Sequence, residues 1–218
     1  MFRNYDVVIF DFDGTIACTE EGILRSATHA LASLGHPVPD AAVLRSFIGP
    51  PLHDSFVTAC GLTHEQADCA VAAYRARYAE RGIYEASAYP GMPELLRWLR
   101  QQGIRVGVAT GKPAVFTQKI LENLGLSQYV EALSAARLED RSDVKPRLIT
   151  EVRQQLPGRA LMVGDRKYDL DGARACGIDG LGVLYGYGSA EELRACSPIG
   201  LARTVEDIYE YIGEGGAC

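Results

Sequence analysis

The chain has 218 residues, of which 47% are hydrophobic and 23% charged, and its formal net charge is −6 at pH 7. This is the composition of an ordinary globular protein with enough apolar residues for a substantial core. The acidic balance gives no electrostatic reason to bind a nucleic acid polymer, and no apolar stretch approaches the roughly 20 residues that cross a bilayer. The first residues lack the long apolar region and the cleavage site of a secretory signal. We therefore expect a cytoplasmic protein without nucleic acid or membrane partners.

Short apolar runs alternate with amphipathic segments along most of the chain. Continuous apolar runs predict buried strands at residues 7–10, 104–109, 160–163 and 180–184, with a weaker strand at 130–134. Amphipathic spacing predicts helices at residues 93–102, 113–124, 146–155 and 168–176. This alternation indicates an α/β fold, with a Rossmann-like parallel sheet core and helices on both faces.

One region departs from this alternation. Between residues 17 and 86 the pattern predicts helices without a convincing strand, at residues 20–34, 40–47, 51–60 and 64–81. Thr63 and Gln66 have the spacing of a capping box at the start of the last helix. We expect a small α-helical domain, residues 17–86, inserted after the first strand of a core formed by residues 1–16 and 87–218.

Two carboxylates follow the first predicted strand directly. Asp11 and Asp13 stand two positions apart, which places both side chains on one side of the chain where the strand ends. In an open α/β sheet, ligands bind at that edge, and two carboxylates there repel each other unless a cation neutralises them. An Asp-x-Asp tripeptide is common by itself, but its place after a strand and before Gly14 and Thr15 predicts a reactive site.

The next strand end carries groups suited to phosphate. Thr110 and Gly111 precede a predicted helix, where a hydroxyl and free backbone N–H groups can cradle an anion. A threonine in that place is more often a simple helix cap. Lys112 follows directly, and Lys145 begins a later helix. An isolated lysine is usually a solvated surface charge. The prediction that Lys145 belongs to the site therefore depends on its position along the chain relative to the other motifs.

A third strand end supplies further carboxylates. The predicted strand at 160–163 runs into Gly164 and Asp165, and Asp169 follows four residues later. Mg²⁺ prefers an octahedral set of oxygen ligands, often one or two carboxylates with water and phosphate oxygens. We predict that Asp165 completes a magnesium site begun by Asp11, whereas a simple turn is the alternative interpretation of this Gly-Asp pair.

Four motifs thus follow one another along the chain: Asp11 with Asp13, Thr110 with Gly111, Lys145, and Gly164 with Asp165. In this order they resemble the motifs of the haloacid dehalogenase (HAD) superfamily, and the resemblance spans essentially the whole chain. A helical cap inserted after the first motif is typical of that superfamily. Three stretches resemble its phosphoglycolate phosphatase-like branch, which includes proteins described as 5′-nucleotidases; they are Ile-Gly-Pro-Pro-Leu at 48–52, Tyr-Pro-Gly at 89–91 and Gly-Asp-Arg-Lys-Tyr-Asp at 164–169.

The resemblance implies a magnesium-dependent phosphatase that hydrolyses the phosphate monoester of a small molecule. Asp11 would be the nucleophile that forms an aspartyl-phosphate, and Asp13 the general acid and base. Lys145 would balance the charge of the phosphate and of Asp11. The remaining implied contacts are Asp11, Asp165, Asp169 and the backbone carbonyl of Asp13 for Mg²⁺, and Thr110, Gly111 and Lys112 for the substrate.

The same residues bear on several alternatives. A dehalogenase needs no acid at position 13, and phosphonate hydrolysis in this superfamily uses a cap lysine that residues 17–86 lack. A sugar-phosphate mutase and an inactive phosphate sensor stay open as alternatives. The substrate stays open among phosphoglycolate, a nucleoside 5′-monophosphate and a sugar phosphate, with Arg25, Arg45 and His53 as candidate cap contacts. A monomer and a homodimer are equally compatible with the sequence.

Overall fold

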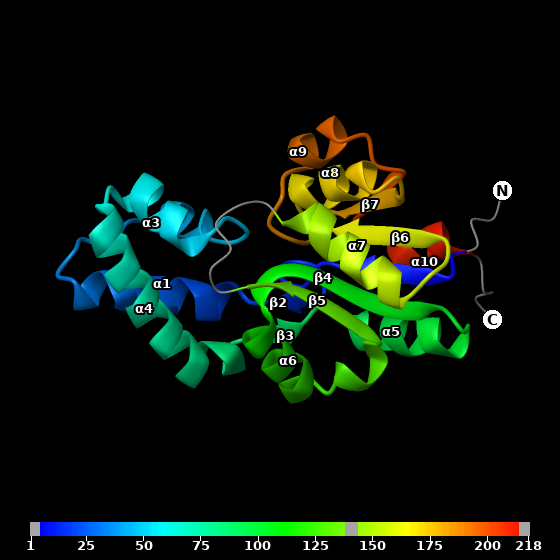
Figure 1. The fold of residues 1–218 in the computed structure, drawn as a ribbon, viewed down its shortest axis with the longest axis horizontal. Coiled ribbons are helices and arrows are strands. Elements are labelled where there is room, and N and C mark those ends of the chain that lie inside the picture. Colours follow the sequence, from blue (N-terminus) through cyan, green and yellow to red (C-terminus); the bar gives the residue numbers. More distant parts are fainter. Residues whose placement is uncertain (1–4, 138–143, 214–218) are drawn as a thin grey trace. The chain divides into compact units, whose positions relative to one another are not determined.

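The computed structural model describes residues 5–137 and 144–213 of the chain. The described residues divide into two compact units. The first unit, which we call the sheet unit, comprises residues 5–18, 88–137 and 144–213, and the second, the helical unit, comprises residues 19–87 (Figure 1). The remaining parts of the predicted core, residues 1–4, 138–143 and 214–218, lie outside the described residues.

The sheet unit is built on a six-stranded parallel sheet with the order β5-β4-β1-β6-β7-β8. The strands are β1 (Val7–Phe10), β4 (Arg105–Pro113), β5 (Ala132–Ala136), β6 (Ala160–Gly164), β7 (Asp179–Val183) and β8 (Gly200–Ala202). Strand β1 pairs with β4 on one side and with β6 on the other, so that Val7 lies opposite both Arg105 and Ala160. Because the strands are parallel, the carboxyl ends of β1, β4 and β6 share one edge of the sheet. The predicted α/β fold with a parallel sheet is confirmed.

Helices cover both faces of this sheet. They are α5 (Met92–Gln101), α6 (Ala114–Asn123), α7 (Lys145–Gln155), α8 (Lys167–Ala175), α9 (Ala190–Ala195) and α10 (Asp207–Ile212), with a 3₁₀ turn η2 (Ser127–Tyr129). Helices α7 and α8 lie on one face, and α5 lies on the other (Figure 1). This is the arrangement that right-handed crossover connections produce.

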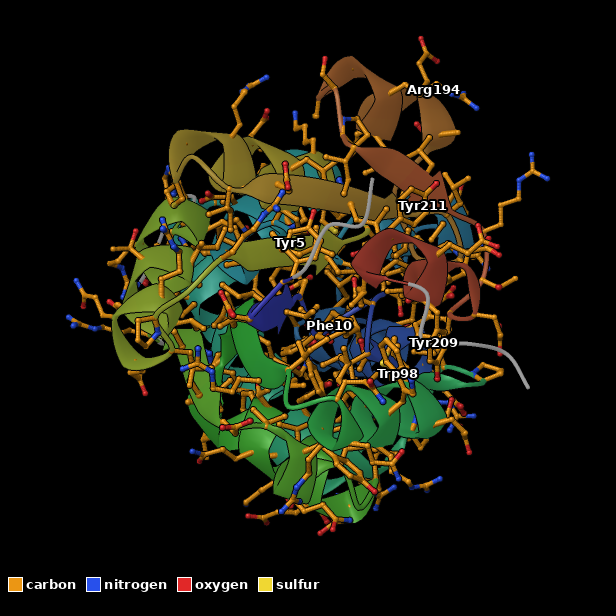
Figure 2. The ribbon with its side chains drawn as sticks, turned by 90° about the vertical axis from the view of Figure 1, so that its right-hand side faces the viewer. Tyr5, Phe10, Trp98, Arg194, Tyr209 and Tyr211 are labelled. Carbon is orange, nitrogen blue, oxygen red and sulfur yellow. The ribbon has the colours of Figure 1, made fainter. Side chains whose placement is uncertain are left out.

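Alternation along the strands decides which side chains each face receives. Val7 and Ile9 of β1 belong to a buried cluster with Leu148 and Val152 of α7. Phe10 is fully buried at the centre of the sheet unit (Figure 2). On the face that carries α5, the ring of Trp98 packs edge-on against Tyr209 of α10 with 4.8 Å between the ring centres (Figure 2). Burial of such side chains is the main driving force that holds the helices on the sheet.

The helical unit contains α1 (Glu20–Ser33), α2 (Ala41–Arg45), α3 (Leu52–Cys60), α4 (His64–Glu80) and the 3₁₀ turn η1 (Gly82–Tyr84). Helices α1 and α4 make its largest packing interface. The capping box predicted at the start of α4 is confirmed: Thr63 Oγ1 accepts from the Gln66 N–H at 3.2 Å, and Gln66 Oε1 accepts from the Thr63 N–H at 3.0 Å. None of the described helices is long and apolar enough to cross a membrane.

The structure corrects several predicted boundaries. Strand β4 continues past residue 109 to Pro113, with a register shift between Thr110 and Pro113 that leaves Gly111 and Lys112 in a bulge against β5. The sequence does not predict β8, since its three residues carry too little pattern. Two short strands, β2 (Ala17–Cys18) and β3 (Ser87–Ala88), pair with each other where the sequence predicts none.

Candidate active site

Three carboxylates converge at the carboxyl edge of the central strands. Asp11 follows β1, Asp165 follows β6, and Asp169 lies in the first turn of α8. One oxygen from each lies within 4.8 Å of the others, and the three residues are at most 8% exposed. Asp11 continues the pairing of its strand, because its N–H donates to the Val163 carbonyl at 2.9 Å. Neighbouring parallel strands therefore bring together residues that are far apart in the sequence.

Local backbone structure fixes the direction of Asp169. Its Oδ2 accepts from the Arg166 N–H at 3.0 Å at the start of α8. A Cβ on Gly164 would overlap the side chain of Asp169, so the strand can approach that carboxylate only because residue 164 is glycine. The Gly-Asp pair is thus more than a turn, since both Gly164 and Asp165 help to form the cluster.

Lys145 supplies the positive charge of this cluster. Its Nζ lies 2.8 Å from Asp11 Oδ1 and 2.7 Å from Asp169 Oδ1, and it donates to the Ala109 carbonyl at 2.9 Å. The side chain is only 7% exposed. A lysine at the first turn of a helix is normally solvated, but here α7 begins where β1, β4 and α8 meet.

The electrostatics of the cluster reflect burial and an excess of negative charge. Burial raises the pKa of Asp11 to about 6, a shift that Lys145 opposes and that the charge of Asp169 reinforces. Burial raises the pKa of Asp165 well above its usual value, and the charges of Asp169 and Asp11 add to the effect. Burial alone would lower the pKa of Lys145, yet the carboxylates of Asp11 and Asp169 raise it above its ordinary value.

The donor set fits a hard divalent cation. Three buried carboxylates, with one ammonium beside two of them, place an excess of negative charge where little water reaches. The raised pKa values of Asp11 and Asp165 reflect the free-energy cost of that charge. Oxygen ligands of this kind suit Mg²⁺, which usually keeps water and phosphate oxygens in its remaining positions. Asp11, Asp165 and Asp169 are the side chains that could hold it.

Asp13 faces a different partner. Its carboxylate oxygens lie 2.9 and 3.3 Å from Nζ of Lys112, whose side chain is 6% exposed. The side chain of Asp13 is therefore outside the group that converges for a cation, which is compatible with the prediction that only its backbone carbonyl binds metal. Lys112 lies at the site, beside the proposed acid and base.

Thr110 and Gly111 lie at the end of β4 beside Lys112. Thr110 is 1% exposed, and its Oγ1 accepts from the Lys112 N–H at 3.1 Å. The residue that precedes α6 is Pro113, so Thr110 lies outside the capping position of that helix. Thr110 is thus not a helix cap. A Cβ on Gly111 would meet nothing within 4 Å, so the space beside this backbone is open.

Comparisons with known proteins agree with this geometry. Residues 8–183 match the family described as haloacid dehalogenase-like hydrolase. The chain belongs to this family. The match covers the three strand ends that carry Asp11, Thr110 and Asp165, so the resemblance stated from the motifs is confirmed.

Relatives of this hydrolase carry different names. It is 40% identical over 198 residues to a protein of Pseudomonas aeruginosa named 5′-nucleotidase, covering 89% of this chain and 90% of that one. It is 38% identical over 213 residues to the tyrosine-protein kinase PtkA of Mycobacterium tuberculosis, covering 95% of this chain and 72% of PtkA. The crystal structure of a predicted phosphatase from Clostridium acetobutylicum superposes with a TM-score of 0.88 at 34% identity, covering 96% of this chain and 99% of that one. Relatives named phosphoglycolate phosphatase match at 25–28% identity.

The candidate cap contacts of this HAD-like hydrolase are engaged within the helical unit. Arg25 pairs with Glu21 at 2.7 Å and with Glu85 at 3.0 Å, and Arg45 lies 2.5 Å from Glu20. The His53 ring stacks on His64, with 5.3 Å between the ring centres, and its nitrogens lie 3.4 and 3.5 Å from Asp54 and Asp68. The role of these three residues in substrate recognition stays a prediction.

Sequence reasoning misses some residues at the site. Thr15, fully buried, donates from Oγ1 to Asp165 Oδ1 at 3.4 Å. The Tyr187 N–H donates to Asp165 Oδ2 at 2.7 Å. The two Tyr-Gly pairs at 185–188 indicate a loop, but they do not indicate that this loop contacts Asp165.

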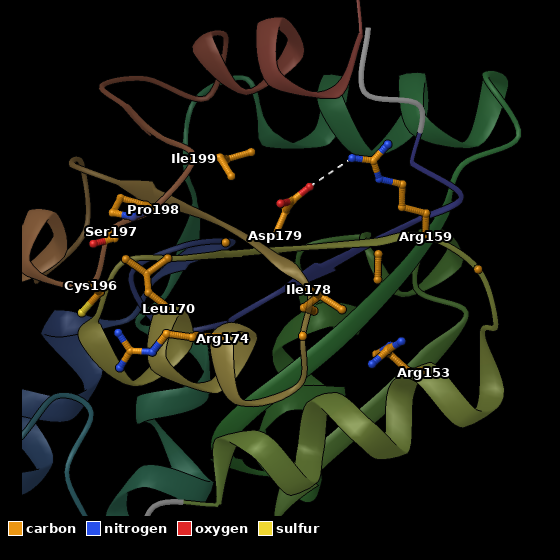
Figure 3. A pocket seen from close by; sticks show the side chains of 14 residues that line it. Arg153, Arg159, Leu170, Arg174, Ile178, Asp179, Cys196, Ser197, Pro198 and Ile199 are labelled. Carbon is orange, nitrogen blue, oxygen red and sulfur yellow. Dashed lines mark hydrogen bonds and ion pairs between the residues drawn. The ribbon is translucent and has the colours of Figure 1, made fainter. Parts of the chain in front are cut away.

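A pocket of about 600 Å³ lies at the amino ends of β6, β7 and β8, at the edge of the sheet opposite to the acidic cluster (Figure 3). Arg153, Arg159 and Arg174 line it, but their guanidinium groups point in different directions (Figure 3). Arg159 pairs with Asp179 at 3.3 Å, and Arg174 pairs with Asp171 at 2.6 Å. Among the described residues that line it, Asp179 is the one carboxylate, so this pocket has no equivalent of the acidic cluster.

Proposed function

We propose that this hydrolase is a magnesium-dependent phosphatase that acts on the monoester of a small phosphorylated metabolite. The observation that carries the proposal is the convergence of buried Asp11, Asp165 and Asp169, with Lys145 paired to Asp11 and Asp169. The carboxylate of Asp13 pairs instead with Lys112. Such a cluster separates a nucleophile at a cation site from a second carboxylate that can exchange protons.

Asp11 is proposed as the nucleophile. One of its oxygens forms a bond to phosphorus as the ester P–O bond breaks, and the electron pair leaves with the ester oxygen, which takes a proton from Asp13. Water then attacks the aspartyl-phosphate, Asp13 takes a proton back, and inorganic phosphate leaves Asp11 free. A bound Mg²⁺ would supply positive charge to the phosphoryl oxygens and to Asp11. Lys145 holds the Asp11 carboxylate in place and balances its charge.

The ion pair between Lys112 and Asp13 bears on the first step. Both Asp13 oxygens lie within hydrogen-bond reach of the Lys112 ammonium, so this partner occupies the carboxylate that is proposed to serve the leaving group. We propose that the Lys112 ammonium shifts its hydrogen bonds from Asp13 to a phosphate oxygen when substrate binds. The Asp13 carboxyl group is then free to exchange a proton with the leaving group. Thr110 and the N–H of Gly111, at the same strand end, are proposed to bind the remaining phosphate oxygens.

The relatives guide the choice of substrate. The 40% identical relative named 5′-nucleotidase favours a nucleoside 5′-monophosphate over phosphoglycolate, whose named phosphatases are more distant. The relative named a tyrosine-protein kinase adds phosphotyrosine and tyrosine peptides to the compounds to be tested. We propose that residues 17–86 form a cap that recognises the part of the substrate beyond the phosphate, on a core of residues 1–16 and 87–218. Oligomeric state and cytoplasmic location stay predictions of the sequence.

The test compares wild type with Asp11→Asn on a panel of phosphomonoesters, with and without magnesium. The substituted amide keeps the shape of the side chain but is too weak a nucleophile to form the phosphoryl intermediate, so hydrolysis should fall by roughly a thousandfold or more. Wild type should lose activity in EDTA and regain it with magnesium. Equal hydrolysis by the two proteins would exclude Asp11 as the nucleophile. Transfer of phosphate between sugars with little free phosphate would indicate the mutase alternative, and no turnover on any compound would favour the inactive sensor.

A further inference from the structure

The segment after β7, Tyr185-Gly186-Tyr187-Gly188, lies directly against Asp165. Besides the hydrogen bond from the Tyr187 N–H, a Cβ on Gly186 would overlap the side chain of Asp165, and a Cβ on Gly188 would overlap its carbonyl oxygen. Neither Gly186 nor Gly188 has a φ in the left-handed region. These positions therefore require glycine for space, and not for an unusual backbone conformation.

A third glycine completes the enclosure from the first strand end. Gly14, whose φ is +82°, also has no room for a Cβ because Asp165 Oδ2 and the Tyr187 ring occupy that space. Asp165 is thus enclosed by backbone from two segments that are distant in sequence. Its fully buried carboxylate has little freedom to choose another rotamer.

The segment is itself held in place at both ends. The Tyr185 hydroxyl donates to the Thr15 carbonyl at 3.2 Å, and its ring packs on Tyr89 with 4.7 Å between the ring centres. On the other side Ser189 caps α9, and Glu192 of α9 pairs with Arg166 at 3.0 Å, next to Asp165. The position of the Tyr187 N–H is therefore fixed by contacts that do not involve the carboxylate it binds.

We infer that residues 185–188 are a positioning element for the cation site, which hold the Asp165 carboxylate in the orientation that binds a divalent metal. The inference rests on the proposed function only in assigning Asp165 to that site. Hydrogen-bond partners that orient a metal ligand typically contribute about 10–100-fold to metal affinity, as their removal shows. The expected role is in metal binding, with little effect on the chemical step once metal is saturating.

The test compares Gly186→Ala with Gly182→Ala. Gly182 lies in β7 just before the segment, and its added Cβ would lie 2.7 Å from a flexible methyl of Leu201, away from the carboxylates of the cluster. Binding of Mn²⁺ is measured directly by electron paramagnetic resonance of the free ion, and the magnesium concentration for half-maximal hydrolysis is measured beside it. Gly186→Ala should bind metal roughly tenfold more weakly or worse, while Gly182→Ala binds as wild type does.

Tyr185→Phe provides a second, milder variant if Gly186→Ala fails to fold. Loss of the hydrogen bond to Thr15 should loosen the segment and weaken Mn²⁺ binding roughly two- to tenfold, the effect of one net hydrogen bond. The inference is overturned if Gly186→Ala folds and binds Mn²⁺ as tightly as wild type does. If Gly186→Ala does not fold, the same result for Tyr185→Phe overturns it. A wild-type protein that binds Mn²⁺ but hydrolyses no phosphomonoester would refute the proposed function and leave this inference standing.

Discussion

The contribution of Lys145 can be tested by removing its charge while keeping its length, as in Lys145→Met. In wild type the ammonium neutralises part of a buried cluster, at 2.8 Å from Asp11 and 2.7 Å from Asp169. Because the lysine side chain is 7% exposed, solvent cannot replace it efficiently. Removal of one partner of a buried ion pair costs about 3–5 kcal/mol of folding free energy.

That loss is large enough to be measured by thermal unfolding. For a chain of this size it corresponds to a fall in the unfolding midpoint of roughly 6–20 °C, at roughly 2–4 °C for each kcal/mol. The assay compares wild type and variant by circular dichroism in EDTA and again with saturating magnesium. Magnesium should recover part of the loss, since a bound cation supplies the charge that the lysine no longer provides.

Lys119→Met is the matched control, because Lys119 is exposed on α6 and lies outside the acidic cluster. It removes the same charge and should leave the midpoint nearly unchanged. An unfolding midpoint for Lys145→Met equal to that of Lys119→Met in EDTA would refute the idea that the lysine balances buried carboxylates.

Two further predictions rest on local features. In metal-free protein the folded state holds the Asp11 proton more tightly than the unfolded chain does, because burial raises its pKa from 3.8 to about 6. This group should therefore lower the free energy of unfolding as pH rises through that window. The increase in unfolding midpoint caused by magnesium should then be larger above pH 6 than below it, and Asp11→Asn should weaken that trend. A magnesium effect that falls with rising pH would contradict the raised pKa of Asp11. Thr63→Ala should remove the capping box of α4 and cost about 1 kcal/mol in urea unfolding, whereas Thr58→Ala, on the exposed side of α3, should change little; equal losses would argue against the cap.

The cation cluster is predictable because a simple rule applies to it. Parallel strands place their carboxyl ends at one edge, so carboxylates that follow two apolar runs, Asp11 and Asp165, must approach each other if those runs are neighbours. The sequence does not give strand order by itself, and the family resemblance supplies that step. Lys145 is predicted only by its order among the motifs, since nothing in its local sequence distinguishes it from a surface lysine.

Other features depend on contacts that leave no local pattern. Lys112, which pairs with Asp13, lies in the bulge after Thr110, and register shifts between strands cannot be predicted from one sequence. Strand β8 is three residues long, too short for a periodicity, and pairs with β7 only through the tertiary fold. The role of Gly186 depends on what lies beside it, which composition and spacing do not reveal.

The most direct test of the central account is to find where the phosphoryl group goes. Asp13→Asn should slow hydrolysis of the intermediate, because no carboxylate at that position then accepts the proton of the attacking water. With a substrate whose leaving group needs no proton, such as p-nitrophenyl phosphate, the intermediate still forms and should therefore accumulate. After acid quenching during turnover with magnesium and a hydrolysed substrate, peptide mass spectrometry should find one added phosphoryl group, located on Asp11. A phosphoryl group on another residue, or substrate turnover by a protein that never carries one, would contradict the account.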